Sequence, residues 1–164
     1  MNRRIKRDLL FFALPAFIVF SAGMAASGWD FLRDFVADQA SLDLLSVRSV
    51  IGLAFVGIGL GIELVAAFTL RRSYSSTLII REDHQLVTHG IYRLTRHPVY
   101  LGVLMVSMGV PIWTTSWIGL LIMLGIIPLI LGRIRSEERM LIDEYGDSYR
   151  AYKKATHKLI PFIY

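Results

Sequence analysis

The sequence predicts an all-α, polytopic membrane protein whose four transmembrane helices include a helical hairpin in the C-terminal half. Three observations lead to this fold class. Hydrophobic residues make up 54% of the 164 residues, the mean hydropathy is +0.52, and long uncharged runs alternate with clusters of charge. The length favours a single membrane domain, residues 1–164. The absence of cysteine excludes disulfides, thiolate metal sites and cysteine nucleophiles.

The first two predicted spans lie in the N-terminal part, residues 1–70. Leu9 to Gly28 are 20 residues without charge, which is enough for one crossing. The basic residues before them also fit a signal peptide, but the uncharged run is longer than a usual signal core, so we expect a retained helix. The second span, Ser49 to Leu70, contains Glu63. An acid at that depth is costly, so Glu63 is expected to serve function beside the hairpin or to bond a neighbouring helix.

The third and fourth spans come from residues 98–132, a run of 35 residues without charge. Roughly 20 residues suffice for one crossing, so the run predicts a hairpin that turns at Thr114–Ser116. Its arms are Val99–Trp113 and Trp117–Gly132, and the two tryptophans are expected at the far membrane interface. Pro111 and Pro128 are expected to bend the arms.

The distribution of charge predicts the orientation of the spans. Of the 18 Lys and Arg residues, 16 lie in residues 1–8, 71–98 and 133–164, and only 2 lie in residues 29–48. The positive-inside rule then predicts that both termini are cytoplasmic. The net charge of +5 is concentrated at the ends of apolar runs, which favours membrane lipids over nucleic acid as the electrostatic partner.

Two polar clusters flank the hairpin and meet if it folds back on itself. The first is residues 86–102, where basic, aromatic and histidine side chains pass directly into apolar sequence, and the second is Arg133–Arg139. Residues 136–155 have helical spacing with an aromatic stripe, and Gly146 is the weak point of that helix. Short extended segments are expected at residues 77–80 and 85–88.

The two clusters and the segment that follows them carry a set of motifs in a fixed order. They are Leu86-Val87-Thr88-x-Gly90-x-Tyr92, Arg96-His97-Pro98-x-Tyr100-x-Gly102, Glu137-Glu138-x-x-Leu141, Tyr145-Gly146-x-x-Tyr149-x-x-Tyr152 and the ending Leu159-Ile160-Pro161-Phe162.

This pattern resembles the isoprenylcysteine carboxyl methyltransferase family of integral membrane enzymes over residues 77–164. The resemblance implies a methyltransferase core, residues 71–164, that uses S-adenosyl-L-methionine. It also implies a cytosolic cofactor pocket capped by the C-terminal helix. The implied acceptor is a lipid-embedded or amphiphilic small molecule, foremost the carboxylate of an isoprenylcysteine.

The resemblance also assigns residues to roles, and it implies no metal. Arg133 is implied to face the acceptor, with Glu137 and Glu138 as the further catalytic candidates. The implied cofactor-binding residues are His84, Gln85, Leu86, Val87, Tyr92, His97, Pro98, Val99, Tyr100 and Glu137.

The residue chemistry fits two acceptors. Arg133 and Glu137 are four residues apart and therefore share a helix face, whereas Glu138 points partly away and ranks second. An ionised carboxylate acceptor needs only a positioning partner, and Arg133 can bind one bidentately. An amine acceptor has to lose a proton, and a glutamate could then be the base.

Alternatives remain open at this point. The chain could be a phospholipid amine N-methyltransferase, a non-enzymatic membrane scaffold or a reductase-like protein. Arg93 and Arg96 could be only positive-inside anchors. The tyrosines of the aromatic stripe are expected to pack rather than to bind a ligand. The sequence leaves the oligomeric state unspecified.

Overall fold

The computed structural model describes residues 9–36, 46–70 and 86–161, and within them the chain is almost entirely helical. The only strand-like pairing there is an isolated bridge between Thr95 and His157. The predicted all-α fold class is therefore confirmed. The elements are a π-helical turn η1 (Leu9–Ala13), α2 (Leu14–Val36), α3 (Val47–Leu70), a 3₁₀ turn η3 (Gly90–Arg93), α4 (Pro98–Trp113), α5 (Trp117–Leu124) and α6 (Ile126–Ala155).

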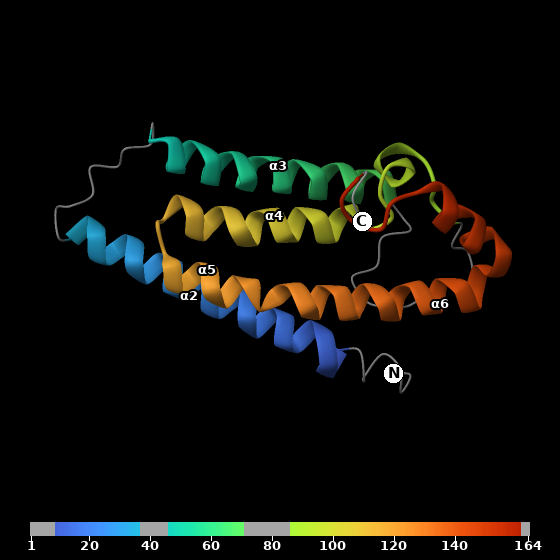
Figure 1. Cartoon of the computed structure of the whole chain (residues 1–164), viewed down its shortest axis with the longest axis horizontal. Helices are drawn as coiled ribbons and strands as arrows, with labels where there is room; N and C mark the ends of the chain where they lie inside the picture. The colour runs from blue at the N-terminus through green and yellow to red at the C-terminus, as the bar shows by residue number, and fades with distance from the viewer. Residues whose placement is uncertain (1–8, 37–45, 71–85, 162–164) are drawn as a thin grey trace.

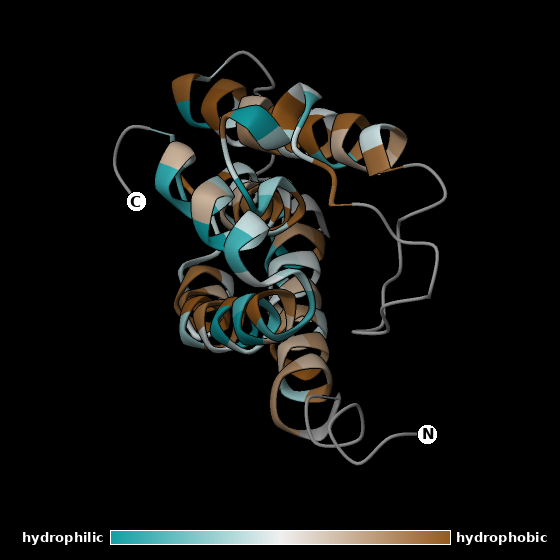
Figure 2. Ribbon diagram, turned by 90° about the vertical axis from the view of Figure 1, so that its right-hand side faces the viewer, coloured by the Kyte–Doolittle hydropathy of each residue, from teal (hydrophilic) through white to brown (hydrophobic). Residues whose placement is uncertain are grey.

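Helices α2, α3 and α4 and the continuous pair α5–α6 lie side by side as a bundle (Figure 1). Three helical stretches are long and apolar enough to cross a membrane, namely Phe11–Asp34, Val47–Leu70 and Trp117–Ala155, and α4 is a shorter apolar helix. The chain is thus an integral membrane protein. Seen from the end where α6 turns back, hydrophilic residues gather in the turned-back part, and the helices behind it are mainly hydrophobic (Figure 2).

Helix α2 extends beyond the predicted end of the first span. The uncharged run ends at Gly28, but the helix continues to Val36. A buried polar contact stabilises this extension, because the Ser116 hydroxyl donates to Asp30 Oδ2 at 2.6 Å. Arg33 lies 3.3 Å from the other oxygen of Asp30 and balances its charge. The helix end is therefore fixed by a tertiary contact with the hairpin turn.

Helices α3 and α4 pack with their backbones in contact. A Cβ atom added to Gly59 would lie 2.8 Å from the carbonyl oxygen of Gly102, and one added to Gly102 would lie 2.7 Å from the Gly59 oxygen. Glycine at both positions permits this close approach. The Glu63 side chain lies against Gly102, so Glu63 does face the hairpin, as predicted.

The hairpin turns where the sequence predicts. Thr115 adopts a positive φ of 57°, and the Ser116 hydroxyl caps α5 by accepting from the Gly119 amide at 2.9 Å. Trp117 is 74% exposed, as an interfacial tryptophan requires. The helical assignment is interrupted at Gly125, between α5 and α6, because Pro128 has no N–H to bond the carbonyl four residues before it.

The return arm also continues past its predicted end. The arm is expected to end at Gly132 and helical spacing to resume at Ser136, whereas α6 runs without a break from the apolar run into the polar segment. Gly146 then interrupts it with φ 54° and ψ −124°, a conformation that glycine adopts readily. The predicted weak point is thus confirmed, and the last part of α6 turns back towards the start of α4 (Figure 1).

The hydrophobic core lies along one face of α6. Ile126, Ile130 and Ile134 are buried there with Leu159 from the C-terminal segment. Residues of α2 and α4, including Tyr100, pack against this cluster. The core therefore holds the first turn of α4 beside the middle of α6, which brings the two polar clusters together.

Candidate functional site

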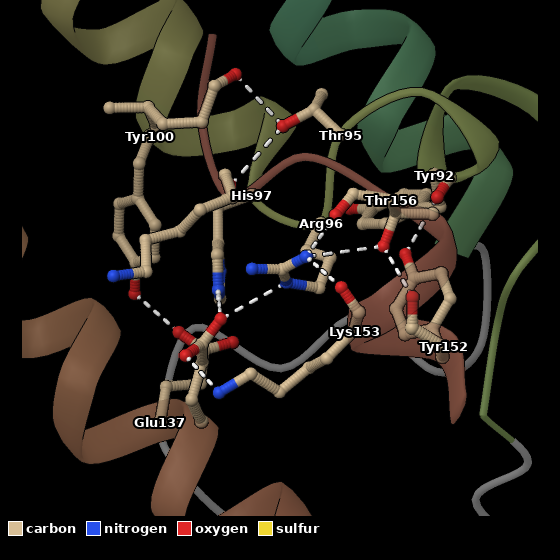
Figure 3. A network of polar contacts seen from close by, with 12 residues as sticks. Tyr92, Thr95, Arg96, His97, Tyr100, Glu137, Tyr152, Lys153 and Thr156 are labelled. Carbon is tan, nitrogen blue, oxygen red and sulfur yellow. Dashed lines mark hydrogen bonds and ion pairs between the residues drawn. The ribbon is translucent and has the colours of Figure 1, made fainter. Parts of the chain in front are cut away.

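The two polar clusters meet at Tyr100. Its hydroxyl donates to Glu137 Oε2 at 2.8 Å, and Arg133 Nε donates to the same hydroxyl at 2.8 Å. Tyr100 stands on the first turn of α4, which Pro98 begins, and the two charged residues occupy successive turns of α6. The predicted contact between the two polar clusters is confirmed, and the Tyr100 hydroxyl makes it through these two hydrogen bonds. Figure 3 shows Tyr100 and Glu137 at one side of the wider network.

Glu138 has a different set of partners from Glu137. Its side chain is buried, and Oε1 lies 3.0 Å from Arg96 Nε, while Oε2 lies 2.9 Å from Lys153 Nζ. The Nε2 atom of His97 is 3.6 Å from Oε1. We call this group, Arg96, His97, Glu138 and Lys153, the clasp. It joins the start of α4, the middle of α6 and the turned-back end of α6.

The clasp keeps the carboxyl group of Glu138 ionised. Glu138 stands six residues beyond the apolar run of α6, and burial by itself would raise its pKa. The neighbouring His97 and Lys153 groups and the charge of Arg96 outweigh burial and lower the pKa of Glu138 to about 2. A buried carboxylate with such partners is stable only in the charged form.

Arg96 is more than a positive-inside anchor, and that reading of the sequence is wrong. Its guanidinium donates to the Lys153 carbonyl at 3.0 Å and to the carbonyl oxygen of Thr156. These carbonyls belong to the C-terminal end of α6, where a cation is favoured by the helix dipole. Arg93, in contrast, is exposed. Arg96 therefore caps the last helix and bonds Glu138 at the same time.

Further contacts hold the C-terminal segment against residues 92–96. The Thr95 hydroxyl donates to the Leu159 carbonyl at 2.9 Å, and the Tyr152 hydroxyl donates to the Tyr92 carbonyl at 2.6 Å (Figure 3). Tyr149 is 1% exposed and its ring packs edge-on against Tyr152. The prediction that these tyrosines pack is confirmed for Tyr149 and Tyr152.

Six of the other predicted cofactor-binding residues belong to the described part of the chain. Tyr92, His97 and Pro98 are buried, and Leu86, Val87 and Val99 are half-buried. The extended segment expected at 77–80 and the site residues His84 and Gln85 lie outside the described residues. Of the segment expected at 85–88, residues 86–88 are described and belong to neither a helix nor a strand.

Several contacts were not foreseen from the sequence. Thr95, Lys153 and Thr156 belong to the network through the fold of the C-terminal segment, which leaves no local signal. The burial of Glu138 did have a signal. Ile126, Ile130 and Ile134 are four residues apart, and Glu138 is the next member of that buried row.

The residues present fit a cofactor that carries both positive and negative groups. Glu137 offers a carboxylate acceptor. The Nε2 atom of His97 is buried and makes no hydrogen bond to a described residue, because Glu138 Oε1 at 3.6 Å is too distant for one, and this is costly unless a ligand or water supplies the bond. Tyr92 adds a buried aromatic ring. The donors and acceptors match S-adenosyl-L-methionine in kind.

Comparisons with known proteins agree with this arrangement. A probable protein-S-isoprenylcysteine O-methyltransferase of Oryza sativa subsp. indica is 33% identical over 118 residues, which cover 70% of this chain and 62% of the relative. The protein-S-isoprenylcysteine O-methyltransferase of Schizosaccharomyces pombe is 32% identical over 123 residues, covering 73% of this chain and 52% of the relative. The chain thus spans only part of the length of these relatives.

A solved structure has the same fold. The eukaryotic intramembrane Ras methyltransferase ICMT (isoprenylcysteine carboxyl methyltransferase) superposes with a TM-score of 0.73 at 27% identity, covering 88% of this chain and 52% of that one. The predicted resemblance to isoprenylcysteine carboxyl methyltransferases is confirmed. The sequence model of one family, described as phospholipid methyltransferase, matches residues 47–148, which include α3, the hairpin and most of α6. The chain therefore belongs to the phospholipid methyltransferase (PEMT) family.

Proposed function

We propose that the chain transfers a methyl group from S-adenosyl-L-methionine to the carboxylate of an isoprenylcysteine-like acceptor in the membrane. Relatives named protein-S-isoprenylcysteine O-methyltransferases support the activity. The observation that carries the proposal is the bonded chain Arg133–Tyr100–Glu137, which places a cation beside a carboxylate at the mouth of the hairpin. The Arg133 cation suits an anionic acceptor, and the Glu137 carboxylate suits the cationic cofactor.

The cofactor side of the site would be built by α4 and α6. When bound, S-adenosyl-L-methionine supplies a methyl group on a sulfonium sulfur, which leaves as a neutral thioether. Glu137 would accept hydrogen bonds from its ammonium or ribose, and His97 would donate to its carboxylate. Leu86, Val87 and Tyr92 would form a flat apolar slot for adenine. His84, Gln85, Pro98, Val99 and Tyr100 complete the proposed cofactor-binding set.

The acceptor side rests on Arg133. A guanidinium can hold a carboxylate through two parallel hydrogen bonds and so fix its direction. The carboxylate is ionised at neutral pH, so the step needs no base. Holding the reacting groups in line and away from water can lower the activation barrier by roughly 7–11 kcal/mol in favourable cases. Positioning is therefore the main task of these residues.

A phospholipid amine acceptor is the second candidate, favoured by the name of the matching family. Arg133 would then hold the lipid phosphate, and Glu137 would take the proton of the amine. The two acceptors make opposite demands on Glu137. A base is essential for the amine and unnecessary for the carboxylate.

Binding and transfer can be tested separately in detergent. Calorimetry should detect S-adenosyl-L-methionine binding to the wild type and to the control Glu144→Gln, which alters an exposed acid on the same helix. Binding should be lost in His97→Ala and Glu137→Gln. A folded wild type that binds no cofactor overturns the proposal and favours a membrane scaffold, and binding of a nicotinamide cofactor instead would favour the reductase-like reading.

Transfer of labelled methyl to a farnesylcysteine analogue, set against transfer to extracted phospholipids, separates the two acceptors. Arg133→Met should abolish transfer, and Arg135→Met, which alters an exposed cation, should not. Label in the phospholipid fraction alone would replace the carboxylate acceptor with the amine. We also propose that both ends of the chain are cytoplasmic, which protease protection of terminal tags in oriented vesicles can check.

A further inference from the structure

Tyr100 bonds both the acceptor-side cation and the cofactor-side carboxylate. Its hydroxyl donates to Glu137 and accepts from Arg133 Nε, each at 2.8 Å. A phenol hydroxyl has one proton to donate, so these two bonds have a defined direction. Any movement of the hydroxyl changes both contacts together.

The position of that hydroxyl is set by α4, whereas both of its partners stand on α6. The Tyr100 ring packs on the core cluster and lies with its centroid 5.8 Å from that of His97. The ring is therefore held from two sides. Tyr100 is the polar connection between the two arms of the hairpin at this level, and it fixes Arg133 and Glu137 relative to each other.

The bond to Tyr100 also restricts how each charged group can meet a ligand. Arg133 uses Nε for the tyrosine, so a bidentate carboxylate has to approach the terminal Nη1 and Nη2 edge. Glu137 uses Oε2, so a cofactor ammonium or hydroxyl is directed to Oε1. Bonds between a neutral hydroxyl and two charged groups polarise one another, so strengthening one strengthens the other.

We propose that Tyr100 is a positioning residue that couples the acceptor site at Arg133 to the cofactor site at Glu137. Each ligand should bind more tightly when the other is present, because either one orders the shared hydroxyl. Such coupling is reciprocal, and factors on the order of 5–150-fold are typical. This inference rests on the proposed function, and it assigns to Tyr100 a role beyond contact with the cofactor.

The first test measures the dissociation constant of S-adenosylhomocysteine by calorimetry, which requires no acceptor. Arg133→Met should weaken that binding several-fold in the wild-type background, although Arg133 faces the other site. In the Tyr100→Phe background the same substitution should change it less than twofold. Arg135→Met is the matched control and should have no effect in either background.

The second test adds the acceptor analogue. A saturating farnesylcysteine analogue should tighten S-adenosylhomocysteine binding in the wild type and lose that effect in Tyr100→Phe.

A third measurement, made without ligand, covers the case in which a variant binds nothing. The melting-temperature effects of Arg133→Met and Glu137→Gln should be more strongly non-additive with Tyr100 present than in Tyr100→Phe, where only the direct attraction between the two side chains remains.

The outcomes separate the two proposals. If S-adenosylhomocysteine binds and Arg133→Met weakens it equally in both backgrounds, the coupling is overturned and the proposed function stands. If the folded wild type binds no S-adenosylhomocysteine, the proposed function is overturned, and the coupling of ligands with it. Additive melting-temperature effects in the wild-type background also contradict the coupling.

Discussion

Removing the Glu138 carboxylate should release the turned-back end of α6 and leave the rest of the bundle folded. The side chains of Arg96 and Glu138 are only 7% and 8% exposed, so Glu138→Ala leaves a buried guanidinium without its counter-charge. Breaking a buried pair in this way costs about 3–5 kcal/mol. The loss of the 2.9 Å contact with Lys153 adds to this cost. The destabilisation should be local, because the other contacts of the bundle are unchanged.

Hydrogen exchange in detergent measures this effect directly. Amides of residues 147–159 should exchange on the order of 100-fold faster or more in Glu138→Ala, since 1.4 kcal/mol corresponds to a factor of ten, and amides of α3 should not change. Glu144→Ala is the matched control. Arg96→Met combined with Glu138→Ala should recover part of the loss, because no buried charge then lacks a partner. Unchanged exchange at residues 147–159 in a folded Glu138→Ala protein would refute the reasoning.

The remaining predictions concern the contact between α3 and α4, the hairpin turn, the break in α6 at Gly146 and the response of the clasp to low pH. Gly59→Leu should lower the melting temperature in detergent and cost about 1–3 kcal/mol, because the new side chain meets the Gly102 carbonyl. Ser116→Ala should cost about 1–3 kcal/mol in the same measurement, since it removes a buried donor to Asp30. Gly146→Ala should speed exchange beyond the break through backbone strain alone, as no atom lies within 4 Å of the added Cβ. The clasp should stay closed at neutral and mildly acidic pH and open as pH falls from the ordinary carboxyl range towards about 2, where its lowered pKa lies. Protection at residues 147–159 followed against pH checks this, and opening near pH 6 would contradict it.

The sequence predicted the spans well because membrane crossing depends on length and hydrophobicity, which are local properties. The hairpin turn and the break at Gly146 also have local signals, a polar triplet and a glycine within a helix. The ends of helices were predicted less well. Helix α2 continues past Gly28 because Ser116 bonds Asp30, and those residues are 86 positions apart.

The candidate site also contains contacts that the sequence predicts and contacts that it does not. The meeting of Tyr100 with Glu137 followed from the hairpin, because folding it back brings the two clusters together. The role of Arg96 could not be predicted, since its partners are carbonyls of a segment that folds back only after Gly146. A run of charges at the end of an apolar stretch has the same composition whether the charges face lipid headgroups or one another.

The shortness of α4 has a consequence for where the chemistry takes place. With Trp113 at one interface, Tyr100 lies about 20 Å along the helix at a rise of 1.5 Å per residue. A hydrocarbon core is about 30 Å thick, which is more than the length of α4, so the bilayer beside α4 should thin and bring the ends of the acyl chains close to Tyr100, Arg133 and Glu137. An acceptor can then present its polar end without lifting its tail out of the acyl chains. The rate should also depend on bilayer thickness, because hydrophobic mismatch would raise or sink the site relative to the surface.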